Sequence, residues 1–363
     1  MWTRIKQFFK TRSRSVLYGS IISLVILLLA VLLSTWQFGD EFNEKVKYGS
    51  KSDFAPSLLN GVLVKKELAN LRPVAAMIEN STDARPQVGL VDADVVYEIV
   101  TEGGITRFMA LFQQNLPVKA GPIRSARSYF ISYLREYDGV YVHAGGSPKA
   151  MNDILGFNIK DYAHANDGTY WREPIAGIAS EHTLFANIKD IFKNSVSQRG
   201  WDKTSDYDSW KFKDPEKTVT DGGKVTIKFS SPYFQVDWTH NKTSNTYSRI
   251  LAGEKHLDRL TGKQIKAATV VVMQVGHSYG GTYADNGHEA EWIMRTIGSG
   301  IAWVFEDGKL TKGIWEKNQS TGRTRFYDGG GQEISLNRGK IWVEVIPQDG
   351  SVTRTLPKPK PTT

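Results

Sequence analysis

Hydrophobic and polar residues are arranged in three different ways along the chain. An uncharged apolar run extends from Val16 to Trp36. Between residues 58 and 201, short apolar runs typical of buried strands alternate with amphipathic segments typical of helices. From residue 222 to 350, apolar and polar residues alternate with period two between glycine-rich turns. These patterns predict one transmembrane helix, an α/β N-terminal ectodomain and a mostly antiparallel β second domain.

The first pattern predicts a membrane anchor. Val16–Trp36 spans 21 residues, and a helix of that length crosses about 30 Å of hydrocarbon. Five basic residues precede it, so residues 1–15 are expected to form a cytoplasmic tail and the main body to be extracytoplasmic. A cleaved signal peptide is the alternative, but the run is long and lacks a small-residue cleavage site. We therefore predict a single-pass protein of the cell membrane, with residues 37–57 as a stalk.

Two polar segments are expected to lie outside the packed domains. Residues 202–221 hold many Lys, Asp, Ser and Thr and few apolar residues, and they are predicted to link the two domains. Residues 351–363 end in Pro-Lys-Pro-Lys-Pro-Thr-Thr and are predicted to be a disordered tail.

Composition narrows the possible chemistry. The 363-residue chain has a formal net charge of +8, but five basic residues precede the first acidic one and three follow Gly350. The body between them is therefore neutral, which argues against a nucleic-acid partner, because nucleic acids require a clustered basic face. Cysteine is absent, which excludes disulfides, a thiol nucleophile and zinc–thiolate sites. No cofactor is predicted.

The most informative stretch runs from Asp94 to Lys149. Its pattern predicts a β-hairpin that turns at Glu102-Gly103-Gly104, then a charged loop and a helix. A short buried strand follows and ends at His143, and a second helix begins after the turn at residues 144–148, with proline in its first turn. The two helix starts are therefore expected to lie close together.

Basic residues gather around the first helix start, directly after Gly121-Pro122. Guanidinium groups bind carboxylate or phosphate through paired hydrogen bonds, and a helix N-terminus adds free N–H donors. An anionic ligand is therefore predicted here. The alternative is that the arginines pair with nearby carboxylates and hold the loop in place. The predicted ligand-binding residues are Arg107, Arg124, Ser125, Arg127, Gly145, Gly146 and Ser147.

His143 is the candidate catalytic residue, because it ends a buried strand directly before a glycine-rich turn, a common place for a reactive side chain in an α/β layer. The alternative is a hydrogen-bonded histidine of the core. Glu98, Glu102 and His182 are candidates for acid/base groups or for ion-pair partners. Structural pairing of the two glutamates, for instance with Arg107, is favoured over catalysis.

Two further motifs carry less specific signals. His143, His164 and His182 with Glu181 lack the spacing of a metal site, so no metal is predicted. The pentapeptide at residues 276–280, Gly-His-Ser-Tyr-Gly, matches the serine-hydrolase elbow after a strand. The elbow requires a helix after its serine, whereas a loop is predicted here, so a hydrolase is not favoured.

Three tryptophans recur in the predicted β domain: Trp303, Trp315 and Trp342. They are compatible with a face that stacks on sugars, but such tryptophans are more often core or cross-strand residues. A cell-wall glycan is therefore kept as a possible partner beside a small anionic ligand.

Several longer motifs resemble the YerB-like family. They are RPVAAMIEN, GLVDADVVYEIVTEGGITRFMALF, GPIRSARSYF, YVHAGGSPKA and SEHTLFAN, and the resemblance continues through GSGIAWVFEDGKLTKGIWEK and GKIWVEVIP. It covers most of residues 60–347 and implies a membrane-attached, extracytoplasmic, two-part protein of Gram-positive bacteria without an established reaction. The resemblance also implies a lipoprotein, and a lipoprotein needs a cysteine directly after its signal peptide to carry the lipid. This chain has none, so an uncleaved helix is expected to replace the lipid anchor.

The leading hypothesis is a binding or accessory module of the cell envelope that takes an anionic ligand near Arg124. One alternative is a hydrolase or transferase that acts on a cell-wall or phosphorylated substrate, with His143 as acid/base. Another is a structural partner of a second envelope protein.

Overall fold

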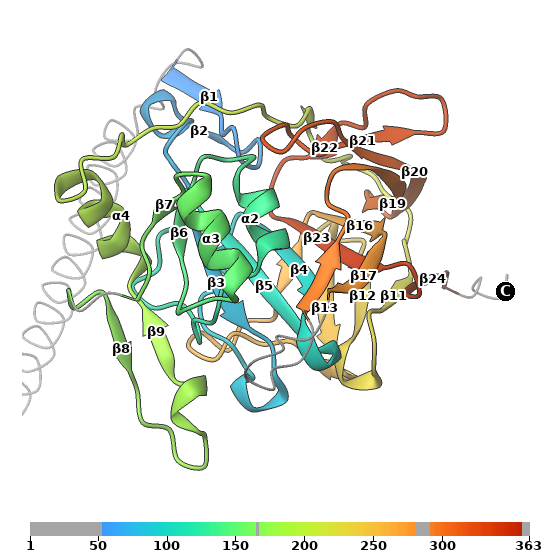
Figure 1. Cartoon of the computed structure of the whole chain (residues 1–363). Helices are drawn as coiled ribbons and strands as arrows, with labels where there is room; N and C mark the ends of the chain where they lie inside the picture. Colours follow the sequence, from blue (N-terminus) through green and yellow to red (C-terminus); the bar gives the residue numbers. More distant parts are fainter. Residues whose placement is uncertain (1–52, 165–166, 281–290, 358–363) are drawn as a thin grey trace, which may run out of the picture. The chain divides into compact units, whose positions relative to one another are not determined.

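The fold is built on a mixed ten-stranded β-sheet, seen in a computed structural model that describes residues 53–164, 167–280 and 291–357 (Figure 1). Residues 55–363 form one compact unit. In spatial order, the strands of this central sheet are β21 (Arg325–Asp328), β20 (Lys309–Lys317), β19 (Gly298–Glu306), β16 (Thr269–Val275), β23 (Ile341–Pro347), β4 (Val95–Val100), β5 (Thr106–Phe112), β3 (Val74–Glu79), β6 (Val140–Val142) and β7 (Lys160–Asp161).

The central sheet joins the two halves of the sequence through β23. This strand runs parallel to both of its neighbours, β16 from the second half and β4 from the first. Strands β3, β4, β5 and β23 are buried along their whole length, because layers cover both faces of the sheet. Such strands read as continuous apolar runs. The second half is mostly antiparallel as predicted, but its last central strand is parallel and pairs across the halves.

Helices cover one face of the central sheet. α2 (Ser128–Leu134) and α3 (Pro148–Gly156) lie side by side there (Figure 1). Phe130 and Tyr133 of α2 and Ile154 of α3 pack with Met77 and Met109 of the sheet in one apolar cluster. The predicted start of α3 is confirmed: Pro148 is its first residue, and the Ser147 side chain accepts a hydrogen bond from the amide of Ala150.

A second sheet and a helix cover the opposite face. The apolar cluster there joins Val74 and Ile78 of the central sheet with Val236 and Trp238 of the second sheet. The strands of the second sheet are β11 (Lys224–Lys228), β12 (Gln235–Asn241), β13 (Thr246–Leu251), β14 (Glu254–Lys255), β15 (Lys266–Ala267) and β24 (Ser351–Thr355). The helix on this face is α4 (Ile188–Ser197).

The remaining elements are short. Four two-stranded pairs are β1 (Phe54–Pro56) with β2 (Leu63–Lys65), β8 (Tyr170–Arg172) with β9 (Leu184–Ala186), β10 (Phe212–Lys213) with β22 (Leu336–Asn337), and β17 (His277–Gly280) with β18 (Glu291–Met294). The 3-10 helices are η2 (Lys66–Leu68), η3 (Thr82–Ala84), η4 (Glu102–Gly104), η5 (Ser180–His182) and η6 (Pro232–Phe234).

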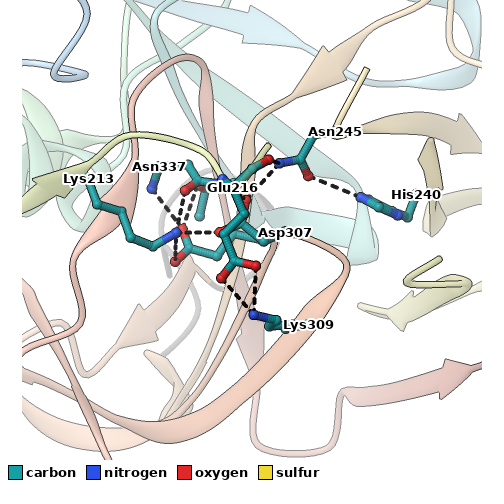
Figure 2. Close-up of polar contacts among 9 residues, drawn as sticks. Lys213, Glu216, His240, Asn245, Asp307, Lys309 and Asn337 are labelled. Atoms are coloured by element: carbon teal, nitrogen blue, oxygen red, sulfur yellow. Dashed lines mark hydrogen bonds and ion pairs between the residues drawn. The ribbon is translucent and has the colours of Figure 1, made fainter. Parts of the chain in front are cut away.

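The segment expected to be a linker packs against the body. Trp210 is buried and its indole N–H donates to the carbonyl of Thr324. Lys213 contacts Asp307, whose carboxylate also accepts from the amide of Glu216, as Figure 2 shows. The buried ring of Trp210 and the contacts to the buried carboxylate of Asp307 therefore fix a stretch whose low apolar content resembles that of a linker.

Two other expectations differ from the structure. Residues Ser351–Thr355, expected to belong to a disordered tail, form β24 and pair with β11. The apolar spacing of residues 183–192 predicts one amphipathic helix over the whole stretch. The helix α4 begins only at Ile188, because Asn187 caps it by accepting from the amide of Asp190, and Leu184–Ala186 form β9 instead. A short apolar run in the sequence fits a buried strand as well as the first turn of a helix, so the pattern did not separate the two.

The predicted cytoplasmic tail, the transmembrane run Val16–Trp36 and most of the stalk lie outside the described residues. Within the described residues, no helix is long and apolar enough to cross a membrane.

Candidate functional site

The loop at Arg124 and the turn after His143 lie side by side at one end of the central sheet. The Arg124 amide donates to the carbonyl of Met77 (2.9 Å), and the Ala144 amide donates to the carbonyl of Arg124 (3.1 Å). The Ala126 amide donates to the carbonyl of Gly145 (2.9 Å). The helix α2 spans seven residues and the strand β6 three, about 10 Å each, so the chain comes back beside the loop it left. We call this region the arginine edge; its charged side chains are Glu79, Glu102, Arg107, Arg124, Arg127 and His182.

The two glycines of the turn have different roles. Gly145 has a φ of 65°, a left-handed conformation that favours glycine. A Cβ on Gly146 would lie 3.0 Å from the sulfur of Met151 and 3.3 Å from the Cβ of Ala126. Glycine at this position therefore lets the turn approach the Arg124–Ala126 segment closely.

Arg124 pairs with Glu79, the last residue of β3. Its Nε lies 3.0 Å from Glu79 Oε1, and its side chain is 29 % exposed whereas that of Glu79 is 5 % exposed. The other oxygen of Glu79 lies 2.9 Å from Nδ1 of His182. His182, an expected ion-pair partner, therefore does reach the arginine edge, through Glu79.

Arg127 pairs with Glu102 through two parallel hydrogen bonds. Its Nη2 lies 2.8 Å from Oε2 of Glu102, and its Nε contacts Oε1. Burial opposes the charge of Glu102, but the Arg127 guanidinium outweighs it and lowers the pKa of this carboxyl. Glu102 is therefore an ion-pair partner here, the role favoured for it by the sequence, although its partner is Arg127 and not Arg107.

Arg107 lies behind these two arginines. It is buried, and its Nη1 donates to the carbonyl of Ser125 at 2.7 Å. Burial first, and then the neighbouring Arg127, lower its pKa to about 10. Among the described residues it forms no ion pair. The arginine edge thus holds three guanidinium groups against the two carboxylates of Glu79 and Glu102.

His143 is fully buried and both of its ring nitrogens have partners. Nδ1 lies 2.7 Å from the carbonyl oxygen of Gly145, and Nε2 lies 2.9 Å from Oδ1 of Asp161. Both partners are hydrogen-bond acceptors, so neither nitrogen is available to a substrate in this arrangement. These contacts correspond to the hydrogen-bonded core histidine that the sequence left as the alternative.

Glu98 lies away from the arginine edge. It is fully buried on the face of the central sheet that the second sheet covers, where it pairs with Arg249 of β13. Neighbouring residues of a strand point to opposite faces, so Glu98 is turned away from the side that carries Arg107 and Tyr97. Its ion-pair partner is Arg249, a residue from the other half of the sequence, and not Arg107.

The remaining sequence signals do not form a second site. Ser278 lies within the antiparallel hairpin of β17 and β18, opposite Ile293, so the strand-to-helix turn of a hydrolase elbow is absent there. Trp315 and Trp342 are buried in the core. Among the described residues, no group of three or more His, Asp or Glu side chains is arranged to hold a metal ion.

Two clefts lie elsewhere on the surface. One of about 370 Å³ is lined by residues that include Arg135, Asn158, Asp206 and Tyr207. The other, of about 210 Å³, includes Phe157 and Ile293. Neither is lined by the arginines of the predicted site.

Sequence reasoning missed Glu79, which holds both Arg124 and His182. The signal that could have identified it is a charged residue at the end of an otherwise apolar strand. At such a position, the strand places the carboxylate at the margin of the sheet beside the loops that follow it.

Comparison with known proteins places the chain in a family. Residues 59–202 match the N-terminal domain and residues 225–343 the C-terminal domain of "Protein of unknown function (DUF3048)". The chain belongs to the DUF3048 family, to which the YerB-like proteins correspond. The two matched regions of this DUF3048 protein are the two halves of sequence whose strands meet at β4 and β23.

A curated relative and a solved structure support this assignment. The DUF3048 protein is 28 % identical over 295 residues to the "Putative lipoprotein YerB" of Bacillus subtilis (strain 168), covering 80 % of this chain and 85 % of that one. It also resembles the crystal structure of YerB from Bacillus subtilis, with a TM-score of 0.71 and 26 % identity, covering 82 % of this chain and 99 % of the other. The predicted YerB-like resemblance is confirmed.

Proposed function

We propose that this DUF3048 protein is an accessory module of the cell envelope that binds an anionic ligand at the arginine edge. The observation that carries the proposal is the surplus of guanidinium groups: Arg107, Arg124 and Arg127 meet two carboxylates there. A bound anion would balance the remaining positive charge.

The exposure of the charged groups supports a ligand from solvent. Arg124 is 29 % exposed and Arg127 is 14 % exposed, so each guanidinium retains some access to solvent while its carboxylate partner holds it in place. Ser125 stands between them and is half-buried. Gly145, in the turn beside the loop, is exposed. This arrangement suits a small anion better than a deep substrate.

The enzyme alternative receives less support. An acid/base role would require one nitrogen of His143 to face a substrate, whereas both nitrogens are hydrogen-bonded inside the core. A structural partner of another envelope protein remains compatible with the same edge, with an acidic side chain of that partner as the anion.

Calorimetric titration of the ectodomain with inorganic phosphate tests the proposal. Charge-assisted hydrogen bonds to arginine contribute about 1.5–3 kcal/mol each, so Arg124→Ala should weaken binding by roughly 10- to 150-fold. Arg325→Ala is the matched control, because Arg325 is 27 % exposed and pairs with Glu333 far from the arginine edge. Glu102→Gln should strengthen binding, since it releases Arg127 from its carboxylate. Equal phosphate affinity in all four proteins, or none in any, would refute the anion site.

We also propose that Val16–Trp36 anchors the protein, with the described body outside the cell. The support is the charge-free run behind five basic residues, together with a relative named as a lipoprotein and the absence of any cysteine to carry a lipid. Mass spectrometry of the membrane-extracted protein should find Val16–Trp36 retained. A mature N-terminus beyond residue 30 would contradict the anchor.

A further inference from the structure

Two carboxyl side chains lie next to each other in the interior, where the two halves of the sequence meet. Glu344 of β23 pairs in register with Glu98 of β4, and both side chains are fully buried. The second sheet covers them and places Arg249 of β13 against Glu98, and Arg249 is also fully buried. One guanidinium therefore faces two carboxyl groups.

The hydrogen bonds distinguish the two carboxyls. Glu98 is satisfied on both oxygens: Oε1 accepts from the Thr106 hydroxyl at 2.7 Å, and Oε2 accepts from Arg249. Glu344 Oε1 accepts from the indole N–H of Trp238 at 2.7 Å, whereas its Oε2 has no donor among the described residues. An ionised, unpaired oxygen beside a second carboxylate would be very costly in this interior. A proton on Oε2 removes that charge and supplies a donor towards Glu98.

Among the described residues, no cation other than Arg249 contacts the pair. Arg249 can only donate, so Nδ1 of His256, 2.5 Å from its Nη1, is an acceptor and carries no proton. Nε2 of the same ring must then carry the proton and donate to Oε1 of Gln87 at 2.7 Å, which makes His256 neutral. Burial, and then Arg249, lower the pKa of His256 well below its ordinary value. The other cation that faces the cluster, Arg85, donates to Asn80 and contacts neither carboxyl.

The same chain of hydrogen bonds reaches the arginine edge. Nε2 of Gln87 donates to the carbonyl of Glu79 and to Oδ1 of Asn80, each at 2.9 Å. The side chain of Glu79 holds Arg124 and His182. Gln87 thus links the backbone of Glu79, the acid partner of Arg124, to His256 and through it to Arg249.

We propose that Glu344 carries a proton in the folded protein, and that this proton keeps the Arg249–His256–Gln87 chain, and with it Glu79 and the anion site, in place. Loss of the proton sets a second negative charge beside Glu98, which draws Arg249 away from His256. The effect on ligand binding rests on the proposed function, whereas the protonation of Glu344 does not. Burial, and then the neighbouring Glu98, raise the pKa of Glu344 well above its ordinary value, in agreement with this assignment.

Infrared difference spectroscopy tests the proton directly. The spectrum of the wild type minus that of Glu344→Gln at neutral pH should contain the carbonyl band of a carboxylic acid. The control is Glu254→Gln, which changes an exposed glutamate of β14. The spectrum of this variant should still contain the band, so the band should cancel in the difference between the wild type and Glu254→Gln. Glu344 is ionised, and the proposal fails, if the wild type lacks the band. If Glu344→Gln does not fold, the wild type alone provides the same test. The absorbance of the carboxylic-acid band should then decrease as the pH is raised and Glu344 ionises.

Unfolding measurements and phosphate titrations test how the protonation of Glu344 affects stability and phosphate binding at different pH values. A carboxyl whose pKa is raised by folding stabilises the protein below its unfolded pKa, and this contribution is lost as the pH rises towards the folded value. The wild type should therefore lose stability with rising pH relative to Glu344→Gln, and parallel profiles would overturn the proposal. Phosphate affinity should fall in the wild type by up to about tenfold per pH unit once Glu344 ionises, the limit for one required proton, but not in Glu344→Gln.

The outcomes of the two proposals are separable. If phosphate binds neither protein, the anion site is wrong, while the infrared band and the stability profiles still decide the protonation of Glu344. If phosphate binds both proteins with the same pH dependence, the anion site survives and its coupling to Glu344 is refuted.

Discussion

Glu136, two residues after the end of α2, and Lys317, the last residue of β20, form a fully buried ion pair with an N–O distance of 2.7 Å. The second oxygen of Glu136 accepts from the amide of Thr324 and lies 3.4 Å from a nitrogen of Arg323, which is also buried. One carboxylate from the first half of the sequence thus holds two cations from the second half.

Removing that carboxylate should destabilise the protein strongly. In Glu136→Gln, the charges of Lys317 and Arg323 remain buried without compensation, and breaking a buried pair in this way costs about 3–5 kcal/mol. Urea unfolding monitored by circular dichroism would measure it. The control is Asp153→Asn, which breaks the surface pair with Lys149 and should cost less than about 0.5 kcal/mol. Similar losses in both variants would contradict this account of Glu136.

Asp307 should make stability depend on pH in the acid range. Burial opposes its charge, but the Lys213 ammonium, Asn245 and Asn337 lower its pKa from 3.8 to about 2. A carboxyl with a lowered pKa stabilises the folded state above its unfolded pKa, and this contribution disappears as the pH falls through the folded value.

Asp307→Asn keeps a residue type that tolerates the φ of 51° at this position and removes the charge. We expect a loss of roughly 1.5–3 kcal/mol at neutral pH, the range for hydrogen bonds to charged groups. The difference between the variant and the wild type should shrink between pH 4 and pH 2 in equilibrium unfolding. A constant difference across that window would show that the charge of Asp307 is not the cause.

His143 should behave as a residue of the core. His143→Ala removes the ring contacts to the carbonyl of Gly145 and the carboxylate of Asp161 and creates a cavity, so we expect a loss of about 2–4 kcal/mol. Thermal unfolding would measure this loss. Unchanged stability together with altered phosphate binding would instead favour a direct role of His143 at the arginine edge.

Ser278 should be dispensable. It is exposed on β17 within a two-stranded hairpin. Ser278→Ala should change the free energy of unfolding by less than about 0.5 kcal/mol, as surface substitutions do. A fluorophosphonate probe should not label the wild type at this serine. Labelling that Ser278→Ala abolishes would revive the hydrolase alternative.

The local pattern of the sequence determined the elements around the site. The apolar runs of β3 and β4, the hairpin turn at Glu102–Gly104 and the start of α3 at Ser147-Pro148 all follow from burial periodicity, turn glycines and capping. The approach of the Arg124 loop to the turn after His143 follows as well, because helix and strand lengths limit where the chain can return.

Tertiary structure alone decided which side chains became partners. The spacing of apolar residues indicates that a residue is buried, but it does not indicate which distant strand lies beside that residue. The insertion of β23 next to β4 brought Glu344 to Glu98, and the second sheet then brought Arg249 to the same place. In the same way, Arg124 met Glu79 because both are at one margin of the sheet. Polar groups pair with whatever the packing brings within about 3 Å, a distance too short for sequence spacing to specify across hundreds of residues.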